Sequence, residues 1–339
     1  MKRSKFFVLG VVVVIAGVVA LALTLRVQMR CAGFPGPGVT PAELPSGPPA
    51  AGLVRFAHFN LRNFPLDERR QTAGLGYSRR TNICDMQDAL GGLNAQVMGF
   101  VEVSDTRRFP PILRRAGGGR PMRILFSQGA GRGGQHLAVA WDGDLFELVE
   151  GPIDIDSVIV KPGLRPALAV RLRSKLDPGW DFTVVEVHLD SGRDDLQHRL
   201  DQVELLADWL GDWFDQTGDS DLILQGDFNT MGGRRVSAEE ELEMVDGILA
   251  EVGLVRVPNA TGCSQYWEGP ARGDGVFESS LLDLVYLSGL EATGPARSWL
   301  HCERLQCGDL ISRAGDEDGT FFDVSDHCPV TFEVQTGEE

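Results

Sequence analysis

The segment Asp221–Thr230, D-L-I-L-Q-G-D-F-N-T, constrains the fold of this chain more than any other stretch. Its apolar run Leu222–Leu224 predicts a buried strand. Gly226 indicates a turn, and Asp227 and Asn229 follow at the carboxyl end, on the same side of a chain of period two. A carboxylate and an amide on a rigid strand end can orient and deprotonate a water molecule. Taken alone, the segment is more typical of an Asx turn.

Other acid, amide and imidazole side chains recur at the ends of predicted strands. Asp283 interrupts the apolar strand L-L-D-L-V-Y-L, where a buried carboxylate needs either a partner or a proton. Each of the others has an ordinary explanation as a turn or strand-end residue. The full set is Asn60, Glu102, His188, Asp227, Asn229, Asp283, Asp326 and His327. Together these residues predict a site that combines acids, bases and oxygen ligands.

The chemistry of the set favours a hard metal ion. Oxygen ligands from Asn60, Glu102 and Asp326 suit Mg²⁺ or Mn²⁺ rather than zinc. His188 and His327 lie beside acids, an arrangement that suits charge stabilisation and proton transfer. The sequence contains no G-x-S-x-G elbow, P-loop, H-E-x-x-H or dinucleotide fingerprint.

The N-terminus predicts attachment to a membrane. Residues 1–5 form a basic tip, followed by the uncharged apolar run Phe6–Leu25. At about 1.5 Å per residue this run matches a bilayer core of about 30 Å. We therefore predict an uncleaved transmembrane signal anchor, with the body outside the cytoplasm, in the periplasm or extracellular space. The alternative is a cleaved signal and a secreted protein, although the apolar region of a signal is usually about 7–15 residues long.

Residues 26–52 are rich in Pro and Gly towards their end and predict a tether. The body, residues 53–336, is predicted to be the catalytic domain. Its expected strands are Leu53–Asn60, Ala95–Val103, Met122–Ser127, His136–Asp142, Leu145–Glu150, Ala167–Arg173, Phe182–His188, Leu222–Gln225, Leu281–Leu287 and Pro329–Val334. Its expected helices are Arg79–Asn94, Arg193–Gln216 and one from the capping box at Ser237 to about Glu251. Strands and helices that alternate with hairpins predict a mixed-sheet α/β sandwich.

The charge distribution bears on the substrate. The chain carries a net charge of −16, which excludes a generic polyanion binder. The segment Thr106–Ala140 reverses this balance, because it contains seven arginines and no acid. A solvated surface explains such a run, but arginine also pairs with phosphate in a bidentate manner. The candidate substrate-binding residues are Arg107, Arg108, Arg114 and Arg115.

Six motifs, in order, resemble the endonuclease/exonuclease/phosphatase superfamily. They are F-N-L-R-N-F, V-E-V-S-D, V-H-L-D-S-G, G-D-F-N-T, L-L-D-L-V and S-D-H-C-P-V, and they span about residues 53–334. E-V-x-D and G-D-F-N look more like the secreted deoxyribonuclease branch. Two positions depart from the family pattern: Val101 replaces a frequent Gln, and Leu284 replaces a frequent His or Tyr.

The resemblance implies a four-layer α/β sandwich, with two mixed sheets face to face and helices outside. It also implies that Glu102 binds Mg²⁺, with Mn²⁺ as an alternative, and that Asn60 and Asp326 lie in or next to the ligand shell. Such a metal ion and the residues around it would stabilise the negative charge that develops during phosphoryl transfer.

The resemblance further implies roles for the remaining residues. Asp227 would orient and deprotonate the attacking water, and Asn229 would help to hold the water or the phosphate. His327, paired with Asp283, would stabilise the pentacovalent phosphorus. His188 would do the same or protonate the leaving oxygen, and the sequence does not decide which histidine is the acid.

The expected function is a Mg²⁺-dependent phosphodiester hydrolase, in the first place a nuclease that acts on DNA or RNA. A lipid-headgroup phosphodiesterase similar to sphingomyelinases, or a phosphatase, is the alternative, and a non-catalytic binding module is a third class. The expected partners are nucleic acid as substrate and the membrane through the N-terminal helix, and no protein partner is implied. We also expect at least one disulfide among Cys263, Cys302, Cys307 and Cys328, with a zinc site that uses His301 as the rival.

Overall fold

The computed structural model describes residues 43–66, 80–269, 274–311 and 319–336. The predicted anchor, Phe6–Leu25, lies outside these ranges and stays a prediction. Within them, no helix combines the length and the apolar character that a membrane span needs.

Two six-stranded sheets form the centre of the domain. The first has the order β13 (Arg297–Ser298), β15 (Val330–Gln335), β1 (Leu53–Phe64), β2 (Val97–Val103), β4 (His136–Asp142) and β3 (Met122–Phe126). The second has the order β5 (Phe146–Ile155), β6 (Ala167–Ser174), β7 (Asp181–His188), β8 (Leu222–Asp227), β12 (Asp283–Ser288) and β9 (Val255–Arg256). The pairs β1–β2 and β7–β8 are parallel, and the other pairs are antiparallel.

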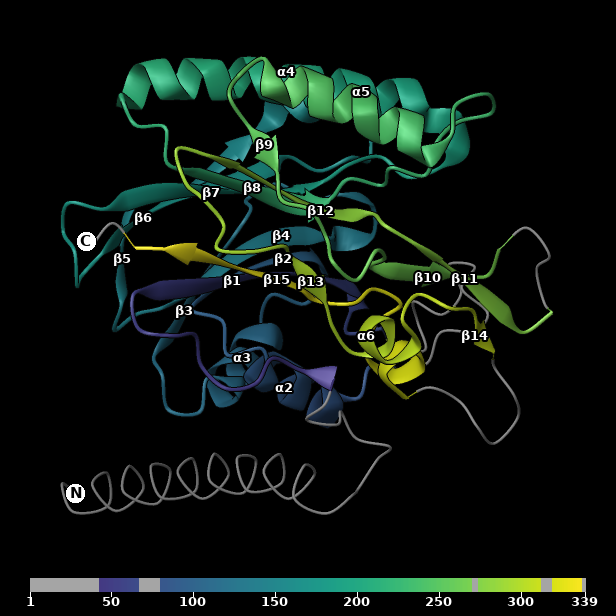
Figure 1. Cartoon of the computed structure of the whole chain (residues 1–339), viewed down its shortest axis with the longest axis horizontal. Helices are drawn as coiled ribbons and strands as arrows, with labels where there is room; N and C mark the ends of the chain where they lie inside the picture. Colours follow the sequence, from purple (N-terminus) through teal and green to yellow (C-terminus); the bar gives the residue numbers. More distant parts are fainter. Residues whose placement is uncertain (1–42, 67–79, 270–273, 312–318, 337–339) are drawn as a thin grey trace, which may run out of the picture. The chain divides into compact units, whose positions relative to one another are not determined.

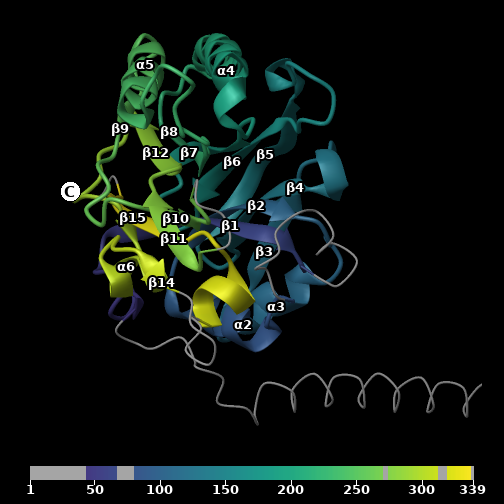
Figure 2. The same cartoon turned by 90° about the vertical axis from the view of Figure 1, so that its right-hand side faces the viewer.

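The two sheets pack face to face, with helices on their outer faces (Figures 1 and 2). An apolar cluster that includes Phe56, Phe182 and Ile223 fills the space between the sheets. Helices α2 (Ile83–Gly92) and α3 (Phe109–Ala116) cover the first sheet, and α4 (Leu196–Thr217) and α5 (Ala238–Ala250) cover the second. The predicted sandwich of two mixed sheets flanked by helices is confirmed.

Local sequence signals explain two of these helices. At the start of α5, the Ser237 hydroxyl accepts a hydrogen bond from the Glu240 amide, and the Glu240 carboxylate accepts one from the Ser237 amide. This is the predicted capping box. Helix α3 was not expected from the sequence, and its first turn contains Pro110 and Pro111. Proline is tolerated there, since the first turn of a helix leaves its N–H groups unpaired anyway.

A small third sheet packs at one end of the sandwich, beside α6 (His301–Leu305) (Figure 1). Its strands are β10 (Gln265–Trp267), β11 (Val276–Ser280) and β14 (Leu310–Ile311), which are too short for a sequence pattern to reveal. Two disulfides, Cys263–Cys307 and Cys302–Cys328, cross-link this region. The expected disulfide is therefore confirmed. The rival zinc site does not fit, because both cysteines beside His301 are already bonded to each other.

The last part of the predicted tether contacts the domain. The Glu43 carboxylate is buried and accepts a hydrogen bond from Arg304 at 2.6 Å. Leu44 packs beside Gly92 of α2, and the Gly47 carbonyl accepts a hydrogen bond from Arg55. Residues 43–47 are thus part of the packed body rather than a free spacer.

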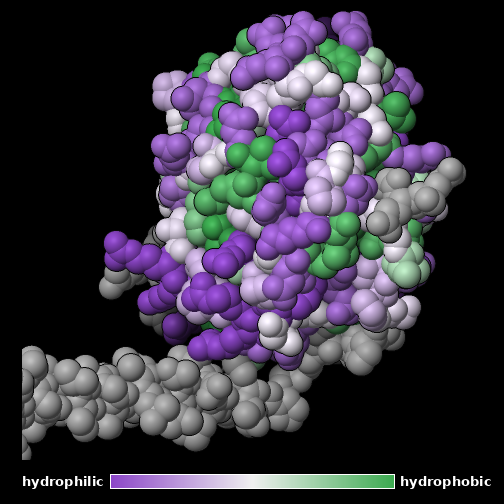
Figure 3. Space-filling view, turned by 90° about the vertical axis from the view of Figure 1, so that its left-hand side faces the viewer, coloured by the Kyte–Doolittle hydropathy of each residue, from purple (hydrophilic) through white to green (hydrophobic). Residues whose placement is uncertain are grey.

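The exposed apolar side chains are dispersed over the domain. Leu148 and Val149 lie on the edge strand β5, and Leu176 lies in the turn after β6. The face seen in Figure 3 is mostly hydrophilic, with hydrophobic patches separated by polar side chains. This face therefore lacks the single large apolar patch that marks many docking surfaces.

A buried ion pair joins α4 to the first turn of α5 and leads to a prediction about stability. Arg199 and Glu241 are fully buried and pair at 2.6 Å. Arg199→Leu should lower the free energy of unfolding by about 3–5 kcal/mol, because it leaves a buried carboxylate without its partner. Denaturant unfolding measures the change. Arg234→Leu, which removes the exposed pair with Asp194, is the matched control and should have little effect. Equal losses in the two variants would contradict this account.

Candidate active site

The polar site is a continuation of the core between the sheets. Alternate residues of a strand face the same side, so Phe56, His58 and Asn60 of β1 all face the second sheet. The facing strand β8 presents Gln225 and then Asp227 in the same way, after the apolar Ile223. The interface therefore changes from apolar to polar and ionisable groups towards the carboxyl ends of these strands.

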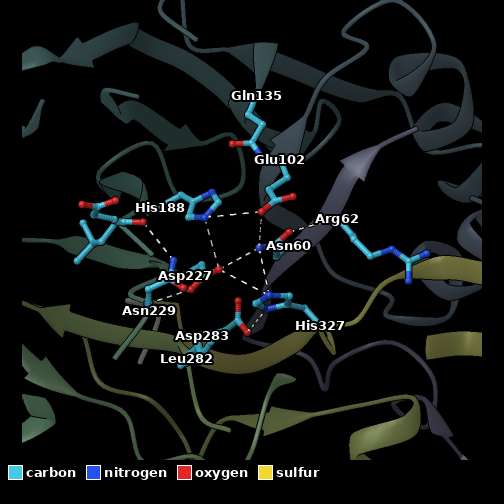
Figure 4. Close-up of polar contacts among 12 residues, drawn as sticks. Asn60, Arg62, Glu102, Gln135, His188, Asp227, Asn229, Leu282, Asp283 and His327 are labelled. Atoms are coloured by element: carbon cyan, nitrogen blue, oxygen red, sulfur yellow. Dashed lines mark hydrogen bonds and ion pairs between the residues drawn. The ribbon is translucent and has the colours of Figure 1, made fainter. Parts of the chain in front are cut away.

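Asp227 lies at the centre of this group (Figure 4). Its Oδ2 atom accepts a hydrogen bond from the Asn60 amide at 2.9 Å. The Nε2 atoms of His188 and His327 each lie 3.7 Å from the same oxygen. Burial raises the pKa of Asp227 to about 6, although the charge of His327 opposes the shift. The carboxylate is thus ionised at neutral pH but is closer to a proton than an ordinary aspartate.

His327 and Asp283 form a buried pair beside Asp227. The His327 Nδ1 atom lies 2.8 Å from Asp283 Oδ2, while its Nε2 atom faces Asn60 and Asp227. Burial disfavours the charged imidazole, but the carboxylates of Asp283 and Asp227 outweigh it and raise the pKa of His327 to about 10. Burial also opposes the charge on Asp283, yet His327 and His58 hold the pKa of Asp283 below its usual range.

His188 differs from His327 in its environment. Its Nε2 atom lies 3.7 Å from both Glu102 and Asp227, and its buried Nδ1 atom has no hydrogen-bond partner among the described residues. Burial and then the positive charge of Arg165 lower the pKa of His188 well below its usual value. The site therefore holds one charged and one neutral imidazole.

The residues expected to hold a metal ion fit that role. Glu102 Oε2 accepts a hydrogen bond from the Asn63 amide, while Oε1 has longer contacts, at 3.5 Å with Asn60 and at 3.7 Å with His188. Burial and then the neighbouring carboxylate of Asp326 raise the pKa of Glu102, so the charged form of Glu102 is disfavoured. A divalent cation would stabilise the charged form, and the oxygen donors suit Mg²⁺ or Mn²⁺.

Backbone geometry places the remaining predicted residues. Gly226 lies inside β8 and does not form the expected turn; a Cβ atom there would be 2.1 Å from the Val187 carbonyl. Asn229 follows the strand end with φ of 51°, so its position does not depend on the period of the strand. Its backbone amide donates to Asp227 Oδ1 at 3.0 Å, and its side chain donates to the Leu189 carbonyl.

A cleft of about 590 Å³ opens above these groups. It is lined by Glu102, His188, Asp227, Asn229 and His327 of the predicted set, and by two arginines, Arg165 and Arg193. Arg165 is largely buried, and its Nε atom has no partner among the described residues.

The four predicted substrate-binding arginines, Arg107, Arg108, Arg114 and Arg115, do not line this cleft. Arg107 and Arg108 are exposed before α3, and Arg108 pairs with Asp105. Arg114 and Arg115 lie in the last turn of α3, on the outer layer of the first sheet. Their contact with a longer substrate stays a prediction.

Sequence reasoning missed several polar residues of the site. They are His58, Gln135, Arg165, Glu186 and Gln225. Three of these stand two residues before a predicted site residue on the same strand, so the period-2 rule was the signal that could have found them. Gln135 donates to the Asn63 side chain, and Asn63 in turn holds Glu102. Arg165 lies in a loop, and no sequence pattern marks it.

Comparison with solved structures places the domain in a known fold. An endonuclease/exonuclease/phosphatase family protein from Bacteroides thetaiotaomicron aligns with a TM-score of 0.52 and 17% identity, over 83% of this chain and 94% of that one. The mannosyl-6-phosphatase Bt3783 of the same organism aligns with a TM-score of 0.51 and 18% identity, over 84% of this chain and 100% of that one. Truncated TDP2 from Caenorhabditis elegans aligns with a TM-score of 0.54 and 14% identity, over 84% of this chain and 98% of that one. No family model and no curated protein matches the sequence. At these identities the likeness confirms the predicted fold.

We expect the protein to bind Mn²⁺, and Glu102→Gln to weaken that binding about 10-fold or more, since even changes outside the ligand shell cost about 10–100-fold. Titration calorimetry measures the affinity. Glu239→Gln is the matched control, because Glu239 lines the same cleft but does not belong to the ligand set. An unchanged affinity in Glu102→Gln would move the metal site elsewhere.

Proposed function

We propose that this chain, which has the endonuclease/exonuclease/phosphatase fold, is a metal-dependent hydrolase of phosphoesters. The observation that carries the proposal is the surrounding of Asp227 by Asn60, His188 and His327 at the base of a cleft, next to the acids Glu102 and Asp326. A carboxylate base, a charged imidazole and a hard-metal ligand pair are the groups that in-line attack of water on phosphorus requires.

In the proposed reaction, Asp227 accepts a proton from the attacking water. Its Oδ2 atom faces the cleft groups, and its Oδ1 atom is held by the Asn229 amide, so the carboxylate has one fixed orientation. A base whose pKa is about 6 is ionised at neutral pH and still has useful basicity.

The positive groups stabilise the charge that develops on the phosphoryl oxygens. These are the imidazolium of His327 and the guanidinium of Arg165, both held within a largely buried site where such charges act strongly. Mg²⁺ or Mn²⁺ on Glu102, Asp326 and Asn60 would add further positive charge beside the phosphate. Because His188 is held neutral, His327 is the better candidate to donate a proton to the leaving oxygen.

For the substrate we propose a phosphodiester of nucleic acid. The support is the pair Arg165 and Arg193 in the cleft, together with the arginines near α3 that can contact neighbouring phosphates. A lipid-headgroup phosphodiesterase or a phosphatase is the second candidate, because a mannosyl-6-phosphatase shares this fold. The membrane anchor and a location outside the cytoplasm belong to the proposal as well, and they rest on the N-terminal sequence alone.

Asp227→Asn should lower kcat by about 10²–10⁴, because a positioned general base contributes about that much. Steady-state hydrolysis of a small chromogenic phosphodiester measures the change. Asp221→Asn is the matched control, since Asp221 precedes the same strand at its opposite end and should leave kcat unchanged. If Asp227→Asn turned over at the wild-type rate while folded, the base would have to be another residue.

The substrate class is tested by assaying plasmid DNA, single-stranded RNA, sphingomyelin vesicles and the chromogenic ester side by side, with Mg²⁺ and with chelator. We expect cleavage of nucleic acid that depends on metal and falls with salt, at about −0.9 in slope for each phosphate contact on duplex DNA. Neutralising Arg107, Arg108, Arg114 and Arg115 together should flatten this slope and leave the small ester unaffected. Turnover of vesicles without cleavage of nucleic acid would replace the nuclease by the lipid-directed enzyme.

A further inference from the structure

A chain of four buried side chains leads away from the cleft. The His327 Nδ1 atom lies 2.8 Å from Asp283 Oδ2, and Asp283 Oδ1 lies 2.9 Å from His58 Nε2. On the other side of the His58 ring, Nδ1 lies 2.5 Å from Glu186 Oε1. Only His327, at 6% exposure, reaches the cleft; His58 and Glu186 have no exposed surface and do not line it.

Further contacts hold Glu186, the residue of this chain of contacts that lies farthest from the cleft. Glu186 Oε2 accepts a hydrogen bond from Gln225 at 3.1 Å, and the same amide donates to the Ala57 carbonyl at 3.1 Å. The opposite sheet leaves room for the carboxylate only because residue 99 is glycine, since a Cβ atom there would lie 1.7 Å from Glu186 Oε2. Each ring nitrogen of His58 faces a carboxylate oxygen, so the ring is held at both ends.

Burying the ionisable side chains of His58 and Glu186 costs desolvation free energy that apolar core residues would not cost. Apart from Gln225, the residues at this level of the second sheet are apolar, namely Leu168 on β6 and Val285 on β12. Apolar residues at 58 and 186 would avoid the desolvation of two ionisable groups, and replacing a buried ion pair in this way is often neutral or stabilising. The stability of the core alone therefore does not explain the pair.

Resting on the proposed function, we propose that His58 and Glu186 are positioning residues of the active site. His58 holds Asp283 Oδ1, so that Oδ2 stays directed at His327 and the Nε2 atom of His327 stays directed at Asn60 and Asp227. The backbone of Asp283 is fixed separately, because its amide donates to the Ser264 hydroxyl.

The consequence of losing His58 follows from this geometry. Asp283 Oδ1 would be left in a dry cavity with no partner, which disfavours its present orientation. The carboxylate can then turn about its χ2 torsion, and the His327 ring loses its fixed direction. The effect reaches the reaction through His327 and not through the binding of substrate, because neither His58 nor Glu186 touches the cleft.

The kinetic test uses the full chain with His58→Gln, Glu186→Gln and the double variant His58→Leu/Glu186→Leu. We expect kcat on the chromogenic ester to fall about 10- to 100-fold, as for other residues that orient a catalytic group, with KM unchanged. The double variant should stay folded, with a modest loss of thermal stability because Asp283 Oδ1 loses its partner, while kcat falls. Arg199→Met/Glu241→Leu is the matched control, since it replaces a buried ion pair outside this chain of contacts and should keep kcat.

A spectroscopic test works without any activity. Because the chain has six histidines, ¹⁵N-histidine labelling resolves the ring N–H signals. The His327 Nδ1–H resonance, shifted downfield by its carboxylate partner, should move in His58→Gln and stay in place in the control pair. An unmoved resonance, or a wild-type kcat in a folded His58 variant, would overturn the positioning role. If the wild type hydrolysed none of the esters, the proposed function would fail, and the resonance would still decide whether His58 orients His327.

Discussion

Two carboxylates on neighbouring strands determine most of what surrounds them. Asp227 of β8 and Asp283 of β12 are direct partners in the antiparallel register, and both are buried. Side chains opposite each other in a sheet lie close together, so two buried negative charges here would repel strongly. His327 relieves this repulsion because Nδ1 contacts Asp283 while Nε2 faces Asp227. The same two acids are contacted by three further groups: His327 lies beside both, the Asn60 amide donates to Asp227, and the His58 imidazole pairs with Asp283.

The topology explains why the site forms at one edge of the sandwich. Each large sheet contains one parallel pair, β1–β2 in the first and β7–β8 in the second. The carboxyl ends of parallel strands meet at the same edge, so Asn60 lies near Glu102, and His188 lies beside Asp227 in register. When the two sheets face each other with these edges together, a single cluster results. Antiparallel pairing alone would separate these strand ends.

Much of this arrangement was predictable from the sequence, because a strand followed by an acid, amide or histidine is a local pattern. Five of the eight predicted residues lie in the carboxyl halves of strands or just after them, whereas Asp283 begins β12, and Asp326 and His327 precede β15. The residues that line the cleft are Glu102, His188, Asp227, Asn229 and His327. His58 and Glu186 lie inside their strands, two residues before Asn60 and His188, where the pattern of a strand followed by a polar residue does not include them. The arginines near α3 show that closeness in sequence to a site residue does not place a residue in the site. They follow Glu102 closely in sequence, but burial of Phe109, Ile112 and Leu113 turns the helix towards the outer layer of the first sheet.

The charge of the chain limits how it can hold an anion. With a net charge of −16, long-range attraction of a polyanion is weak, and any affinity for phosphate must come from cations close to the reacting group. Among the described residues that line the cleft these are Arg165, Arg193 and His327, and Glu239 also lines it. Under the proposed function, such a site would bind one phosphate through short-range contacts. Under the proposed function, the arginines near α3 would contact further phosphates of a longer substrate, while the cleft would carry out the chemistry.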